Sequence, residues 1–146
     1  MMLDQIRNKV QRLLTKNFNV RLGEDNEWII TKGSASVWVE VDSFEGPEGE
    51  LGHITLTVPL VHNVKLTPEV HKWVALEGHQ FKFGTVCAYE FTDKPGLGNL
   101  MMEYSLFGAD VDESELCTAV ALLAISGDKL DTDLNKKFGG EMFGKD

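Results

Sequence analysis

Two segments of the chain carry apolar residues at the three- and four-residue spacing of an amphipathic helix. Residues 3–18 read LDQIRNKVQRLLTKNF, and their apolar stripe comprises Ile6, Val10, Leu13, Leu14 and Phe18. Residues 69–76, EVHKWVAL, follow Thr67 and Pro68. Threonine is a good N-cap, and proline at the first helical position loses no hydrogen bond. The pattern therefore predicts a long first helix and a short capped second one.

A third and longer helix is predicted in the last quarter of the sequence. Its apolar seam comprises Leu116, Val120, Leu123, Gly127, Leu130, Leu134 and Phe138. Asp110 with Glu113 three positions later is typical of a capping box, and Gly139-Gly140 suits the end of the helix near residue 138. Residues 141–146 are predicted to be a frayed tail. Gly127 leaves two alternatives open, a close-packing point or a break in the helix.

Five segments alternate with the period of two that is typical of β-strands. They lie around Trp28 and Ile30 and in SASVWVEV, HITLTVPLV, FKFGTVCAYEF and LMMEYSLF. The glycine- and glutamate-rich stretch 44–52, FEGPEGELG, has no period and is predicted to be a loop. The residues expected on the inward face are Val37, Val39, Val41, Ile54, Leu56, Val58, Leu60, Phe81, Phe83, Cys87, Tyr89, Phe91, Leu100, Met102, Tyr104 and Leu106.

The predicted elements follow one another in the order α-β-β-β-α-β-β-α. Short connections between strands indicate a mainly antiparallel five-stranded sheet packed with helices, which is an α+β fold. The sequence shows no repeat and no linker, so residues 1–146 are expected to form a single domain.

Pro59 lies inside one of the predicted strands, in the run HITLTVPLV. Proline lacks the N–H that a strand neighbour needs and is therefore found at sheet edges, strand ends or bulges. The strand is expected to end, bulge or lose one neighbour near residues 58–60.

The second face of the predicted sheet is not wholly polar. The apolar residues expected there are Trp38, Pro59, Val61, Val86 and Met101. An apolar patch on a surface marks a partner site, so these five form the candidate peptide surface. Two alternatives stay open: a helix of the same chain covers the patch, or a second copy does so in a homodimer.

Charge and composition narrow the class of partner. The chain has 23 acidic and 14 basic side chains, a net charge of −9, and this charge repels nucleic acid and anionic membrane surfaces. It suits a cationic partner. The two cysteines have no metal or disulfide spacing, and no apolar run is long enough to span a membrane. We expect a cytoplasmic protein.

Catalytic motifs are missing from the sequence. The histidines His53, His62, His71 and His79 lack the spacing of a metal site, and Cys87 and Cys117 have the pattern of small core residues. Nucleotide-binding and nucleophile-elbow motifs are absent. We therefore predict no catalytic residue, no metal and no cofactor. The alternative is a small enzyme that uses a carboxylate or histidine base in a cleft.

Three stretches carry a family resemblance: VPLVHNVKLTPEVHKWVAL, FKFGTVCAYEF and ELCTAVALLAISGDKLDTDLNKKFGG. With the order of elements, they resemble the YbjN-like proteins, which are akin to type III secretion chaperones. The resemblance implies a chaperone-like α+β module that is homodimeric, binds peptide segments of a client protein and has no catalytic residue. Some relatives are described as sensory-transduction regulators.

Overall fold

The structure is a computed structural model that describes residues 2–143. Within these residues the chain forms three helices and seven strands, which confirms the predicted α+β fold with an antiparallel sheet but corrects the number of strands. In chain order the elements are α1 (Met2–Asn17), β1 (Val20–Leu22), β2 (Trp28–Lys32), β3 (Ala35–Gly46), β4 (Gly49–Lys65), α2 (Pro68–Glu77), β5 (Thr85–Glu90), β6 (Leu97–Phe107), α3 (Glu113–Phe138) and β7 (Glu141–Met142).

The sheet is antiparallel throughout, with the strand order β1-β2-β3-β4-β6-β5 and β7 paired with β4. Its longest hairpin joins β3 and β4, and their pairing continues to Gly46 opposite Gly49. The prediction of a loop over residues 44–52 was therefore wrong. This end of the hairpin is mostly exposed, so no buried face imposes the alternation by which a strand is recognised.

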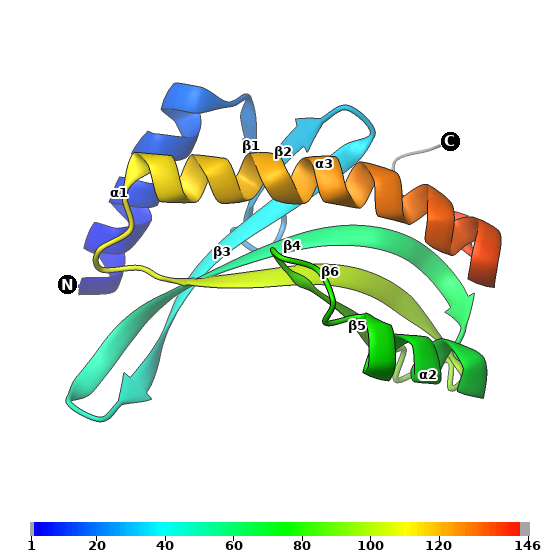
Figure 1. Ribbon diagram of the computed structural model, residues 1–146. Coiled ribbons are helices and arrows are strands. Elements are labelled where there is room, and N and C mark those ends of the chain that lie inside the picture. Colours follow the sequence, from blue (N-terminus) through cyan, green and yellow to red (C-terminus); the bar gives the residue numbers. More distant parts are fainter. Residues whose placement is uncertain (1, 144–146) are drawn as a thin grey trace.

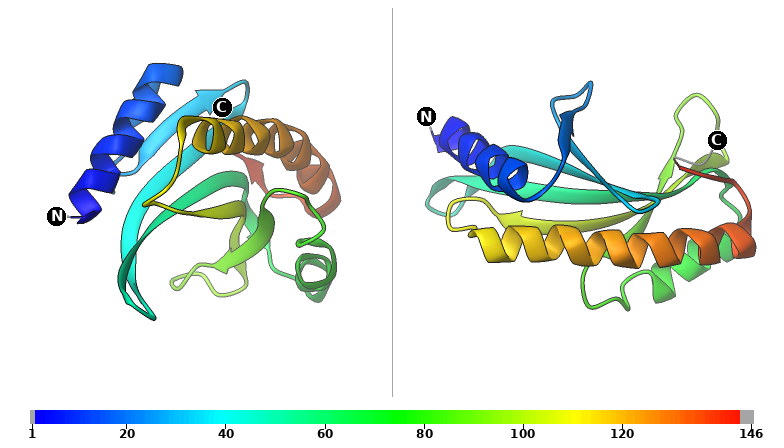
Figure 2. Two further views of the ribbon diagram at one scale, coloured as in Figure 1. Left: turned by 60° about the vertical axis from the view of Figure 1, so that its left-hand side comes forward. Right: turned by 90° about the horizontal axis from the view of Figure 1, so that it is seen from above.

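The helices pack on one face of the sheet, called here the inner face (Figure 1). Helix α3 lies over the sheet and runs roughly along the line of β4 and β6, with α1 beside its start and α2 near its end, and further views show how strongly the sheet twists (Figure 2). Ile6 of α1 lies against Gly52 and Gly108, where any side chain would collide with it. The core is formed by the helix stripes and the inner-face residues of β2, β3, β4, β5 and β6.

The start of α2 agrees with the sequence prediction, whereas the start of α3 differs from it. Thr67 caps α2, its hydroxyl accepting a hydrogen bond from the Val70 N–H at 3.3 Å, and Pro68 begins the helix as predicted. Helix α3 is capped by Asp112, which accepts from the Glu115 N–H at 2.7 Å, so the prediction of Asp110 was wrong. The capping carboxylate and the N–H that it accepts from are three residues apart, as in the predicted pair, but the observed pair lies two residues later in the chain.

Helix α3 passes through Gly127 without a break. A Cβ at this position would lie 2.5 Å from Cγ1 of Val58 in β4. Of the two alternatives for Gly127, the structure shows the close-packing point. The helix ends at Gly139, which has φ 78°, as the double glycine predicted.

The segment after α3 differs from its prediction. Glu141 and Met142 form β7 instead of a frayed tail, pairing with His62 and Val61 of β4. Residues 144–146 of the predicted tail lie outside the described part of the chain. A two-residue strand is too short to show any periodicity, so no local pattern predicts it.

Strand β5 begins at Thr85, so Phe81 and Phe83 precede it. Its inner face was assigned wrongly: Val86 is 1% exposed and belongs to the core, whereas Cys87 pairs with Met101 on the other face. Gly84, with φ 91°, interrupts the extended backbone and resets the alternation. Cys87 and Cys117 were both expected to be core residues. Both are half-buried, and neither belongs to the core.

Pro59 behaves as predicted. Pairing between β4 and β6 is irregular between Pro59 and Val61, and pairing between β3 and β4 ends at Trp38 opposite Thr57. The strand thus bulges and loses one neighbour at this point. The bulge places Val61 opposite the core residue Leu100, so Val61 is buried in the core, contrary to the prediction that it faces outward.

Candidate functional site

The face of the sheet opposite the inner face is called here the outer face. Three of the five predicted surface residues come together on it: Trp38 of β3, Pro59 of β4 and Met101 of β6. Pro59 and Met101 are directly opposite each other, and Trp38 lies opposite Thr57, two residues along β4. Trp38 is half-buried, while Pro59 and Met101 are buried. None of the three is part of the core cluster, unlike Val61 and Val86.

Aromatic residues that sequence reasoning did not assign to this face extend the group. Phe143 contacts the Trp38 ring edge-on, with centroids 6.4 Å apart, and lies 5.2 Å from the His62 ring. His62 in turn contacts Phe91 at 5.6 Å. The four rings form a continuous row, which we call the aromatic row. Its members come from β3, β4, the end of β5 and the segment after β7, so no local pattern could have revealed it.

One polar contact orients the centre of the aromatic row. His62 Nδ1 lies 2.6 Å from Oδ1 of Asn99, which is the outer-face residue of β6 next to Leu100. The contact fixes the imidazole between Phe91 and Phe143. Phe91 was predicted to face inward, and its position on the outer face follows from the same reset of alternation at Gly84.

Acidic side chains occupy the outer face beyond Trp38. Glu40 and Asp42 of β3 and Glu103 of β6 all lie there by register. Partial burial raises the pKa of Glu40, and the carboxylates of Glu27, Asp42, Asp25 and Glu103 raise it further. This part of the face therefore has a negative potential that an incoming cation would relieve.

Glu103 is hydrogen-bonded to a residue of the edge strand β5. It accepts a hydrogen bond from the Tyr89 hydroxyl on the edge strand β5. Burial raises the pKa of Tyr89, and this hydrogen bond and the charge of Glu103 raise it further, so the phenol stays protonated as a donor.

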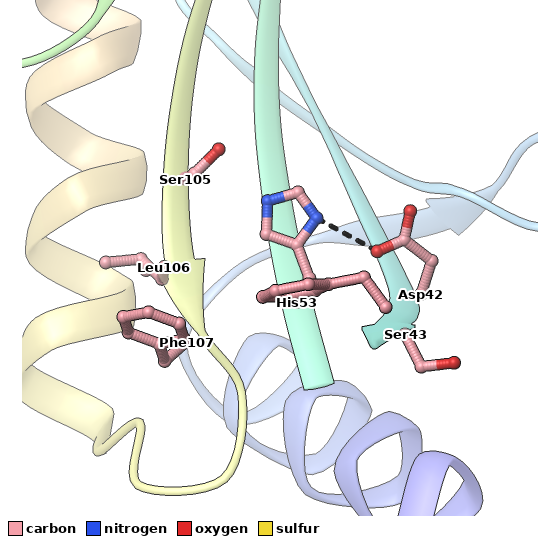
Figure 3. A pocket seen from close by; sticks show the side chains of 7 residues that line it. Asp42, Ser43, His53, Ser105, Leu106 and Phe107 are labelled. Carbon is pink, nitrogen blue, oxygen red and sulfur yellow. Dashed lines mark hydrogen bonds and ion pairs between the residues drawn. The ribbon is translucent and has the colours of Figure 1, made fainter. Parts of the chain in front are cut away.

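The far end of the sheet carries a hollow of about 470 Å³. It lies between the ends of β3, β4 and β6, and its lining is mainly apolar, from Phe44, Leu106 and Phe107 (Figure 3). His53 turns toward Asp42, with Nδ1 2.9 Å from Oδ1, and its ring contacts Phe44 edge-on at 5.9 Å. Phe107 is 68% exposed, so an apolar surface is available here.

A comparison against known families adds to this geometry. The model of the family "T3SS (YopN, CesT) and YbjN peptide-binding chaperone 1", TY-Chap1, matches residues 4–146. The chain belongs to the TY-Chap1 family. This confirms the resemblance to YbjN-like proteins and type III secretion chaperones. A comparison with curated proteins finds no match.

The thiols of this TY-Chap1 chain are poorly suited to nucleophilic chemistry. Burial raises the pKa of the Cys87 thiol, and the charge of Glu103 raises it further. Burial and Glu113 do the same for Cys117, against a smaller lowering by Lys16. A raised pKa lowers the fraction of thiolate, which is the reactive form.

His53 and Asp42 form a histidine–carboxylate contact in this TY-Chap1 chain. Across residues 2–143, no group of three histidine, cysteine or acidic side chains is arranged to hold a metal ion. His71 and His79 are exposed and lie apart from the aromatic row and the hollow. Among the same residues, no helix has the length and apolar character needed to cross a membrane.

Proposed function

We propose that this chain is a non-catalytic, cytoplasmic peptide-binding module of the TY-Chap1 family whose client lies on the outer face around Trp38. The observation that carries the proposal is the meeting of Trp38, Pro59 and Met101 on a face that no helix covers, beside the point where β4 loses its neighbour β3. An extended peptide can bind by pairing with a strand that has lost a neighbour in the main sheet, beside an aromatic surface.

The chemistry of the outer face defines the client. Aromatic and apolar side chains would pack against Trp38 and Met101, and basic side chains would lie near Glu40 and Glu103. The hollow at His53 is six residues along β4 from Pro59, which corresponds to about 20 Å of strand. An extended segment with an apolar residue at each end and basic residues between them fits this surface. No nucleic acid or membrane is part of the proposal, and the charge of −9 disfavours both.

A peptide library displayed on phage and screened against the whole chain tests this function. Selected peptides are then labelled, and their affinity is measured by fluorescence anisotropy. We expect Trp38→Ala to weaken binding at least about tenfold, the cost of removing a central aromatic contact. Trp73→Ala is the matched control, because Trp73 packs on Phe138 between α2 and α3, away from the outer face. Equal losses in both variants would count against binding at Trp38.

Self-association is the alternative use of the outer face. A homodimer formed through this face would bury Trp38 and leave it no room for a client. Light scattering gives the oligomeric state, and iodide quenching of the tryptophan fluorescence, compared between the chain and Trp38→Ala, gives the exposure of Trp38. A dimer that protects Trp38 from iodide would replace the client proposal, whereas a dimer through another surface would leave it intact.

The His53–Asp42 pair favours a second candidate function, acid–base catalysis in the hollow. The carboxylate can hold one tautomer of the imidazole so that Nε2 acts as a base. Against it stand the exposure of Asp42 and the lack of a hydrogen-bonded nucleophile on His53 within residues 2–143. Binding of a small polar ligand that His53→Gln abolishes, with turnover of that ligand, would establish the enzyme. Peptide affinity that His53→Gln leaves within twofold would support the non-catalytic module.

A further inference from the structure

The segment Gly139–Phe143 folds back from the end of α3 onto β4 (Figure 2). Its strand β7 pairs with Val61 and His62, immediately after the stretch where β3 has separated from β4. The segment therefore supplies strand pairing to a part of β4 that the rest of the sheet leaves without a partner on that side. In backbone terms it does what a bound peptide does when it adds a strand to a sheet.

The side chain of Phe143 completes this likeness to a bound peptide. It lies on the outer face between Trp38 and His62, making edge-on contacts with both rings. Within residues 2–143, Phe143 is thus the member of the aromatic row that follows β7, whereas Trp38 and His62 lie in β3 and β4 and Phe91 directly follows β5. It occupies the place where the proposed function puts an apolar side chain of the client.

The segment is held by few interactions. Only two residue pairs join β7 to β4. The side-chain amide of Asn63 donates to Glu141 at 3.4 Å, and that of Asn135 donates to the Gly140 carbonyl at 2.8 Å. Two glycines with positive φ, Gly139 at 78° and Gly140 at 85°, connect the segment to α3. A strand held by two residue pairs can leave its site without unfolding the core.

We propose that Glu141–Phe143 is an internal occupant of the client site, and that the client is an extended peptide with an aromatic residue that displaces Phe143. This inference rests on the proposed function. It adds which side chain of the client is recognised and which segment of the chain competes with the client. The client's backbone pairs with β4 at Val61 and His62, and its aromatic side chain fills the place between Trp38 and His62. The occupied site keeps apolar rings covered until a client competes for them.

Competition by a tethered segment has a measurable consequence. Affinity for a client falls by the fraction of molecules whose site is open. Each aromatic contact corresponds to about a two- to tenfold factor in an equilibrium constant, so removing the Phe143 ring raises the open fraction by a similar factor. Phe143→Ala should bind a client more tightly than the unaltered chain, although it removes an apolar residue from the binding face.

The probe for this test is a labelled peptide with the sequence of residues 139–146, GGEMFGKD, added in trans to the full chain. We expect the Phe143→Ala chain to bind it about two- to tenfold more tightly than the unaltered chain. The same peptide with alanine in place of its phenylalanine should lose that affinity. Phe83→Ala is the control, because Phe83 is a phenylalanine on the surface that contacts Tyr104, away from the aromatic row.

A second variant opens the site by a different route. A Cβ at Gly140 would lie 2.7 Å from Val61 Cγ1 and 2.8 Å from the His62 carbonyl oxygen, and the residue has a positive φ that alanine disfavours. Gly140→Ala should therefore unseat β7 and leave Phe143 intact. It should tighten binding of the peptide in the same direction as Phe143→Ala. Hydrogen exchange should show faster exchange at Glu141–Phe143 in this variant.

The results separate this inference from the proposed function. If phage-selected peptides bind the unaltered chain and Phe143→Ala equally well, or if amides 141–143 keep their protection when such a peptide is bound, the inference is overturned and the function stands. If neither the selected peptides nor GGEMFGKD binds any variant, both are overturned. Tighter binding by both variants, with loss of protection at residues 141–143 on binding, establishes the internal occupant.

Discussion

Gly127 of α3 and Val58 of β4 approach so closely that a β-carbon on residue 127 would lie 2.5 Å from Val58 Cγ1. Both residues are buried. The long helix is seated on the central strand at this point, and the absence of a side chain sets its distance from the sheet.

Gly127→Ala tests this contact. Alanine favours a helix over glycine by about 1 kcal/mol, but overpacking a core costs about 1–3 kcal/mol. The neighbour is a stiff β-branched side chain, so we expect net destabilisation by about 1 kcal/mol in urea unfolding. Ile125→Ala on the same helix is the control, because Ile125 is 63% exposed and should change stability little. A more stable Gly127→Ala protein would show that α3 can move away from β4 at no cost.

The N-cap of α3 gives a prediction with a built-in comparison. Asp112→Ala removes the acceptor of the Glu115 N–H and should cost about 1 kcal/mol of unfolding free energy. Asp110→Ala, two residues earlier, removes a carboxylate with no capping role and should change stability by less than about 0.5 kcal/mol. Thermal or urea unfolding of both variants measures this, and a reversed order would restore Asp110 as the cap.

Val86 and Cys87 test which side of β5 faces the core. Val86→Ala should destabilise the chain by about 2 kcal/mol, the loss of two buried methyl groups and the cavity they leave. Cys87→Ala on the outer face should cost less than half as much. Urea unfolding of the two adjacent substitutions compares the faces directly. Equal costs would mean that β5 does not hold one register.

Glu40 makes stability depend on pH. Its pKa is raised in the folded chain, by burial first and by neighbouring carboxylates second, so the folded state binds this proton more tightly than the unfolded chain does. The stability linked to Glu40 is therefore complete below its unfolded pKa and is lost as pH rises through the raised folded value. Glu40 is largely exposed, so solvent screens these interactions, and we expect Glu40→Gln to be more stable than the unaltered chain at pH 7 by less than about 0.5 kcal/mol.

The measurement is urea unfolding at pH values from 4 to 7. The advantage of Glu40→Gln should grow as pH rises through the raised pKa and then level off. Glu48→Gln, at the exposed turn between β3 and β4, is the control and should show no such trend. An advantage that shrinks with rising pH would mean that the Glu40 carboxylate is stabilised by the fold.

The sequence could predict the elements whose signal is local. The stripe of Ile6, Val10, Leu13 and Leu14 lies within one helix. Its burial can be predicted without knowing which other elements form the core. The Thr67–Pro68 start of α2 is decided by hydrogen bonds within four residues. Pro59 likewise predicted an irregularity, because a proline cannot donate a backbone hydrogen bond to a neighbouring strand, whatever its place in the sheet.

Side-chain directions beyond an irregularity could not be predicted in the same way. A period of two survives only while the backbone stays regular, and one extra residue or one glycine with positive φ reverses every later assignment. The bulge after Pro59 turned Val61 inward, and Gly84 reversed the faces of Val86 and Cys87. Two of the five predicted surface residues were misplaced for this reason.

By itself the sequence determined the α+β class, the three helices, five of the seven strands and the absence of familiar catalytic motifs, because propensity, periodicity and capping act over a few residues. Only the tertiary structure decided which residues form the outer face. The aromatic row joins Trp38 to Phe143 and His62 to Phe91. Such contacts depend on strand register and on where a two-residue strand finds a free partner, and both are settled by packing over the whole sheet.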